Sequence, residues 1–178
     1  MKRTFVLLSL SLGACGASEE APAPAASGDG CVATALAADT VVVAGVGAPD
    51  GPPTWPALPD TAVVASTYLR LQSSGESLQT FDQLSGAVIE ELFRSPGMLG
   101  VSITGSMSCN TTRTLTVWAT QADMFRFVAS GAHVAAIGRV AEVSRGGSIT
   151  ETWPANDLPS LDWADVVPRF SEHDGPVY

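Results

Sequence analysis

The chain has 178 residues, and this length indicates one domain with flanking segments. Nine basic residues stand against 18 acidic ones, which gives a net charge of −9, and Lys2 is the only lysine. Because the chain has no basic patch, it lacks the electrostatic footprint of a nucleic-acid-binding protein, and nucleic acid is excluded as a partner class.

The N-terminus has the order of a secretory signal peptide. Lys2 and Arg3 form a basic start, and an apolar run extends from Phe5 to Leu12. The run is much shorter than the roughly 20 apolar residues that a membrane-spanning helix needs. The following Leu12-Gly13-Ala14-Cys15 resembles the lipobox of bacterial lipoproteins. This resemblance implies a signal peptide over residues 1–14 and a lipid, including palmitate, on Cys15.

A second interpretation of this segment stays open, in which an ordinary signal is cleaved near Ala14 or Ala17 and Cys15 is incidental. In a lipoprotein, Gly16 stands where an aspartate would favour retention in the inner membrane. By resemblance to other lipoproteins, we expect a lipid anchor in the bacterial cell envelope, at the outer membrane.

Two segments separate the lipid site from the folded domain. Residues 15–30 contain Ala, Pro, Ser, Gly and Glu without a large apolar side chain, and we expect a disordered tether. Residues 31–60 form an N-terminal extension, with a predicted strand from Thr40 to Val43 and a connector that holds five prolines after residue 47. Residues 61–178 form the folded domain.

The three cysteines predict one disulfide. If Cys15 carries the lipid, then Cys31 and Cys109 remain as a pair in an oxidising compartment. Such a bridge would stabilise the fold by about 4 kcal/mol in the chain-entropy model. The alternative is two free thiols.

From residue 61 the sequence alternates between strand and helix patterns. Apolar residues at every second position predict strands at Ala62 to Leu71, Leu99 to Thr104, Thr114 to Ala119 and Ser148 to Trp153. Helical spacing predicts a helix from Leu78 to Leu92, one over residues 121–143 that is split at Ser130-Gly131, and a short one from Leu161 to Phe170. The resulting β-α-β-β-α-β order predicts an α+β, ferredoxin-like fold with one antiparallel sheet and helices on one face only.

The two faces of this sheet are expected to differ. The aliphatic face of each strand should meet the helices. The other face is too mixed for a solvent-facing surface, so we expect a ligand, a second subunit or the N-terminal segment to cover it; its residues are Tyr68, Arg70, Ser102, Thr104, Thr116 and Trp118.

A strand that ends in Trp, followed by a helix with Phe and a small-residue step before His, resembles the dimeric α+β barrel superfamily. These features are Leu115-Thr116-Val117-Trp118, Ala122, Met124, Phe127 and Ser130-Gly131-Ala132-His133. The superfamily includes antibiotic-biosynthesis, haem-degrading and spheroidene monooxygenases. The C-terminal pattern is similar to that of an uncharacterised domain-of-unknown-function relative; it comprises Trp153-Pro154-Ala155, Leu158-Pro159-Ser160, Ala164, Arg169-Phe170 and Gly175-Pro176.

The resemblance implies a homodimer paired through its sheets, with a pocket between sheet and helices in each subunit. Carried over residue by residue, it makes Trp118 and His133 the candidate catalytic residues. His133 would be a general base or a haem ligand, which makes haem the one candidate cofactor and His133 a metal ligand only if haem is bound. The alternatives are a helix histidine that hydrogen-bonds its neighbours and a tryptophan that is ordinary packing.

Tyr68, Arg70 and Thr116 are the candidate ligand-binding residues, since Arg and Tyr can bind a carboxylate or a phenol. For Arg70 the alternative is a solvated strand residue. The sequence has no CxxC, HExxH or GxSxG motif, which excludes the zinc and serine-hydrolase sites that depend on them.

Three functions therefore stay open for an envelope lipoprotein with this domain. It could oxygenate a small apolar or aromatic molecule, as a monooxygenase-like enzyme. It could hold such a molecule or haem without turnover, or it could be purely structural. Neither the substrate nor a redox partner can be inferred from the residues.

Overall fold

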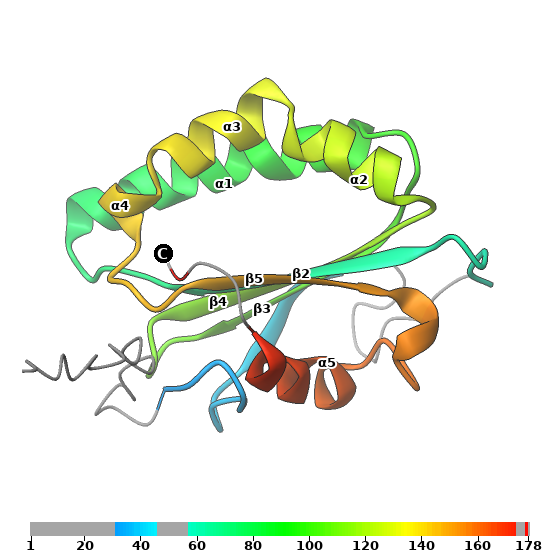
Figure 1. Cartoon of the computed structure of the whole chain (residues 1–178). Coiled ribbons are helices and arrows are strands. Elements are labelled where there is room, and N and C mark those ends of the chain that lie inside the picture. The colour runs from blue at the N-terminus through cyan, green and yellow to red at the C-terminus, as the bar shows by residue number, and fades with distance from the viewer. Residues whose placement is uncertain (1–30, 46–56, 174–176, 178) are drawn as a thin grey trace, which may run out of the picture.

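The computed structural model describes residues 31–45, 57–173 and 177 (Figure 1). The predicted signal peptide, Cys15, the predicted tether and much of the proline-rich connector lie outside the described residues. Among the helices that are described, none is long and apolar enough to cross a membrane.

Five strands form one antiparallel sheet in the order β1-β3-β4-β2-β5. They are β1 (Val41–Gly45), β2 (Val63–Arg70), β3 (Met98–Ser106), β4 (Thr111–Trp118) and β5 (Ile149–Pro154). Strands β2 to β5 and the helices between them have the predicted β-α-β-β-α-β order, so the α+β, ferredoxin-like fold is confirmed. Strand β1 comes from the N-terminal extension and adds an edge strand beside β3.

The helices lie where the helical spacing of apolar residues predicted them, and capping residues define where they begin. They are α1 (Gly75–Arg94), α2 (Gln121–Val128), α3 (Gly131–Gly138), α4 (Val140–Val143) and α5 (Trp163–Arg169), with 3-10 turns η1 (Ala155–Asp157) and η2 (Phe170–Glu172). Helix α1 begins before Leu78 because the side chain of Ser74 accepts a hydrogen bond from the Ser77 backbone N–H. The predicted break at Ser130 is confirmed, since this residue is the N-cap of α3.

Helices cover both faces of the sheet, and the prediction of helices on one face only is wrong. Helices α1 to α4 lie over one face, and α5 lies against the other (Figure 1). Trp163, Val166 and Val167 of α5 belong to a buried cluster with residues of β2, β4 and β5. We call the two faces the helix side, under α1 to α4, and the covered side, under α5 and the N-terminal segment.

The prediction of which β4 side chains face helices α1 to α4 is also wrong. Trp118 lies opposite Val63 and Thr116 opposite Ala65, which places both on the helix side. Leu115 and Val117 point to the covered side instead. Alternation divides a strand into two faces, but it does not decide which face meets which layer when both are buried.

Candidate functional site

Three rings form a row of contacts on the helix side of the sheet. The ring centroid of Trp118 on β4 lies 5.2 Å from that of Phe127 on α2, and Phe127 lies 4.9 Å from His133 on α3. The indole N–H of Trp118 donates a hydrogen bond of 3.0 Å to the Thr116 hydroxyl. That hydroxyl in turn donates to the Ala65 carbonyl at 3.2 Å. The structure thus brings together three of the predicted site residues, Trp118, His133 and Thr116.

The helix caps explain how the sequence places these rings. Thr120 caps α2 by accepting from the Asp123 N–H at 3.1 Å, and Ser130 caps α3 by accepting from the His133 N–H at 3.4 Å. Side chains on a helix tilt toward its N-terminus. The His133 side chain, in the first turn of α3, therefore points back toward the α2–α3 junction and packs on Phe127.

The imidazole of His133 is neutral at ordinary pH. Burial lowers the pKa of His133 below its usual value, and the Val128 carbonyl opposes this shift. The Nδ1 atom is buried and has no hydrogen-bond partner at normal geometry, although the residue as a whole is half-buried. An unpartnered nitrogen inside a structure carries a desolvation cost that a bound donor or acceptor would relieve.

The sheet surface beside this row of rings is not sealed by the helices. The helix-facing side chains of the two central strands are half-buried, whereas their neighbours on the covered side are mostly fully buried. The half-buried residues are Ala65, Thr67, Leu69, Thr112, Thr114 and Thr116. The helix side thus offers hydroxyl groups next to an aromatic cluster and a neutral imidazole, without a charged side chain on these two strands.

The other two predicted ligand-binding residues lie elsewhere. Tyr68 points to the covered side, is 2% exposed, and donates its hydroxyl to the Cys31 carbonyl at 3.0 Å. Arg70 lies at the end of β2 and donates to the Gly146 carbonyl at 3.2 Å. The predicted set of five residues is therefore divided between the two faces of the sheet.

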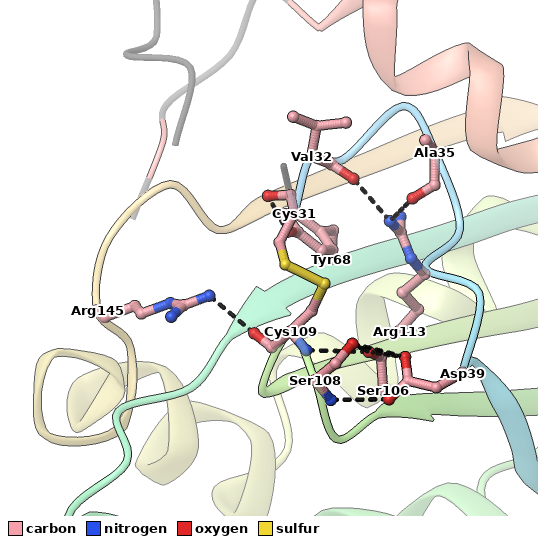
Figure 2. The surroundings of a disulfide bond; sticks show 10 residues. All are labelled: Cys31, Val32, Ala35, Asp39, Tyr68, Ser106, Ser108, Cys109, Arg113 and Arg145. Carbon is pink, nitrogen blue, oxygen red and sulfur yellow. Dashed lines mark hydrogen bonds between the residues drawn. A yellow bond between two sulfur atoms is a disulfide. The ribbon is translucent and has the colours of Figure 1, made fainter. Parts of the chain in front are cut away.

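The covered side has a buried arginine that the sequence analysis did not single out. Arg113 is 4% exposed, and its guanidinium donates to the carbonyl groups of Val32, Ala33 and Ala35 at 3.0, 2.7 and 2.7 Å. It lies 4.3 Å above the ring centroid of Tyr68 (Figure 2). Burial lowers the pKa of Arg113 to about 10, although it stays charged. The N-terminal segment therefore supplies the dipoles that solvate this charge.

A signal for Arg113 was present in the sequence. The residue alternates in phase with Leu115 and Val117, so it shares their buried face. A charged residue in phase with a buried apolar row requires a polar partner from another segment. Which segment supplies that partner depends on the tertiary fold.

The predicted disulfide between Cys31 and Cys109 is confirmed (Figure 2). It ties the N-terminal segment to the β3–β4 hairpin, next to a hollow of about 30 Å³ that Tyr68 and Arg113 also line. Such a volume holds a water molecule and not an organic ligand. The N-terminal segment thus covers the side of the sheet opposite His133.

One carboxylate–histidine pair lies outside the predicted site. The Nδ1 atom of His173 hydrogen-bonds the Glu151 carboxylate on β5, and the His173 side chain is 9% exposed. The Nε2 atom is buried without a partner. Because Glu151 lies opposite Ser66, this pair belongs to the covered side and not to the site around Trp118.

The Nδ1 atom of His133 does not fit a bound haem. A haem ligand needs an imidazole nitrogen that faces a space as wide as a porphyrin. Nδ1 is enclosed, and Phe127 packs against the ring. Within the described ranges, no three His, Cys, Asp or Glu side chains could hold a metal ion.

The fold and the position of the ring row define a ferredoxin-like α+β domain with an aromatic and histidine cluster between sheet and helices. No protein-family model and no curated protein sequence matches this chain. Solved structures to which it is similar include proteins named as an oxygenase or a monooxygenase and others whose names state no activity.

One of them is SnoaB, a cofactor-independent oxygenase from Streptomyces nogalater, with 15% identity, a TM-score of 0.46, and coverage of 56% of this chain and 99% of that chain. Another is a candidate antibiotic biosynthesis monooxygenase from Nitrosomonas europaea, with 13% identity, a TM-score of 0.47, and coverage of 55% and 92%. A conserved protein from Methanosarcina mazei has 14% identity, a TM-score of 0.47, and coverage of 53% and 92%.

Proposed function

We propose that this protein is an exported, lipid-anchored envelope protein whose monooxygenase-like domain binds a small apolar or aromatic molecule on the helix side of its sheet. The observation that carries the binding part is the row formed by Trp118, Phe127 and the half-buried, neutral imidazole of His133. The half-buried surface next to it supports the same part, because a site that the helices had sealed would have no room for a ligand.

The chemistry of the Trp118–Phe127–His133 row limits the class of ligand that it can bind. A neutral imidazole can accept a proton from a phenol or an enol, or hydrogen-bond to it, and it offers little to a carboxylate. The aromatic rings favour a flat apolar body. In the enzymatic form of the proposal, His133 is the base that removes a proton from the substrate before oxygenation, and Trp118 shapes the site. Binding without turnover is the second candidate, and a purely structural role is the third.

Histidine NMR tests the binding proposal, because the chain has only two histidines. We would titrate 1-naphthol into the protein, labelled with ¹³C in its histidine rings. The expected result is a saturable shift of the His133 signal, while the His173 signal on the covered side stays in place. No shift up to about 1 mM, or equal shifts of both signals, would remove the proposed site and favour the structural role.

Two further measurements separate the forms of the proposal. Oxygen uptake in the presence of 1-naphthol, lost in His133→Phe and kept in His173→Phe, is expected of an enzyme; binding without uptake is expected of a carrier. With haemin we expect no Soret shift that depends on His133. A Soret band abolished by His133→Ala would overturn this expectation and indicate haem binding through the other ring nitrogen, Nε2.

The anchor is proposed from the N-terminal sequence. Mass spectrometry of the N-terminal peptide should show acyl chains on Cys15, and Cys15→Ser should leave the protein out of the envelope membrane fraction. An unmodified cysteine, or cleavage near Ala17, would refute the anchor. The expected homodimer stays a prediction; a dimer paired through the sheet would require α5 and the N-terminal segment to leave the covered side.

A further inference from the structure

Four exposed apolar side chains lie around the tip of the β3–β4 hairpin. Met107 at the tip is 92% exposed. Leu36 of the N-terminal segment is 41% exposed. Val41 and Val42, which point to opposite faces of the edge strand β1, are 58% and 53% exposed. We call these four residues the hairpin-tip patch.

Contacts in the structure hold the two parts of this patch together. Strand β1 pairs with β3 just before the hairpin, where Val41 lies opposite Gly105. The Asp39 carboxylate accepts hydrogen bonds from the residues on both sides of Met107, at 2.6 Å from the Ser106 hydroxyl and at 2.7 Å from the Ser108 backbone (Figure 2). The apolar side chain of Met107 is therefore presented to solvent by a fixed turn.

The hairpin-tip patch lies where the chain leaves toward the proposed lipid. Cys31 is bonded to Cys109, two residues after Met107, and Leu36 lines the same hollow as these cysteines. Only 15 residues lie between Cys15 and Cys31 in the sequence. Even a fully extended chain of that length reaches no more than about 55 Å. A lipid on Cys15 would therefore keep Cys31, and the hairpin bonded to it, within about 55 Å of a bilayer.

The charges around the patch favour a neutral surface. Asp39 is ionised, since hydrogen bonds lower its pKa to about 2. Arg145 lies on the other side of the disulfide and donates to the Cys109 carbonyl at 2.8 Å. One negative and one positive side chain give no attraction to anionic lipids, whereas exposed aliphatic groups and a thioether can enter the interface of a zwitterionic membrane.

We propose that the hairpin-tip patch is a membrane-contact surface for a zwitterionic bilayer, and that it orients the anchored domain with the β3–β4 hairpin toward the lipid. In this orientation the Trp118–Phe127–His133 row, at the far end of β4 from the hairpin, lies away from the bilayer, whereas α4 lies near the disulfide-linked end. The inference rests on the proposed lipid anchor. The lipid keeps the protein at the membrane, and the patch determines which side faces it.

Methionine methyl NMR tests this orientation, because the three methionines after the predicted signal peptide differ in exposure. The lipidated protein would be placed in phosphatidylcholine nanodiscs that contain a doxyl-labelled lipid. We expect the Met107 methyl signal to lose most of its intensity, while Met124, which is 4% exposed, and Met98 keep theirs. The methyl signals of Val134 and Ile137, which are 56% and 51% exposed on α3, are the matched exposed controls.

The outcomes of this experiment distinguish failure of the proposed orientation from failure of the proposed lipid anchor. Equal broadening at Met107, Val134 and Ile137 would overturn the membrane-contact surface and leave the anchor intact. Absence of acyl chains on Cys15 by mass spectrometry would refute the anchor, and the orientation with it. A Val41→Ser/Val42→Ser variant should reduce the broadening at Met107, whereas Val134→Ser should not. Broadening of Met107 without lipid label, caused by a second copy of the protein, would also overturn the assignment of the patch to lipid.

Discussion

Removing the Cys31–Cys109 disulfide should lower the free energy of unfolding, mainly because the bridge no longer restricts the unfolded chain. Cys31 and Cys109 are 78 residues apart, and closing a loop of this length restricts the unfolded chain by about 4.5 kcal/mol in the chain-entropy model. Domains of this size have a free energy of unfolding of about 5–15 kcal/mol, so the Cys31→Ala/Cys109→Ala variant should lose a large part of its stability.

The structure also predicts what should survive this change. Arg113 still binds three carbonyl groups of the N-terminal segment, and Asp39 still binds the hairpin. The segment should therefore stay in place at neutral pH. Its amide exchange should become faster than that of the central strands, since opening it no longer requires global unfolding.

Urea unfolding followed by circular dichroism measures the effect, with the oxidised wild type and the double alanine variant at the same pH. We expect a lower midpoint and a slightly larger m-value, because the unfolded chain without the bridge is more expanded. The Cys15→Ala variant is the control and should not change the midpoint. A loss below about 1 kcal/mol would refute the reasoning, since it would mean that residues near Cys31 are already detached before the domain unfolds.

Three further predictions follow from single residues. Burial lowers the pKa of His133 below its usual value of 6.5, so the unfolded state binds a proton more readily than the folded state. The free energy of unfolding should therefore decrease as the pH falls below 6.5, and His133→Gln should remove this part of the decrease. The pKa of Asp39 is lowered from 3.8 to about 2, so Asp39→Asn should remove a stabilisation that is present above pH 4 and lost as the pH falls through 2, as thermal melts would show. Arg113→Met should cost about 2 kcal/mol and speed amide exchange in residues 32–35, whereas Arg126→Met on the exposed surface of α2 should change stability by less than about 0.5 kcal/mol.

Much of the fold could be predicted because its signals are local. The period of two in β2 to β5 and the helical period after Gly75 gave the order of elements, and the small-residue step at Ser130 gave the break between α2 and α3. The pairing of Cys31 with Cys109 also followed from the sequence once Cys15 was assigned to the lipid. These inferences depend on residues close in sequence or on a count of cysteines.

The candidate site was predicted only in part. Trp118 and His133 lie on the same side of the sheet, as the superfamily resemblance implies. Thr116 lies there too, although strand phase had grouped it with Tyr68 and Arg70. Tyr68 and Arg70 were assigned to the same site because strand alternation groups residues by phase and does not say which layer covers each phase. Arg113 and the Glu151–His173 pair were missed because their partners come from segments far away in the sequence.

The sequence by itself determined the strand and helix order, the signal-like N-terminus and the pool of residues with useful chemistry, because periodicity and composition are properties of the chain. Only the tertiary structure decided that residues 31–40 and α5 close one face of the sheet while the other keeps a half-buried surface beside His133. The reason is physical: both faces of the strands are apolar enough to be buried, and the layer that covers each face depends on contacts between distant segments, such as the carbonyl groups around Arg113.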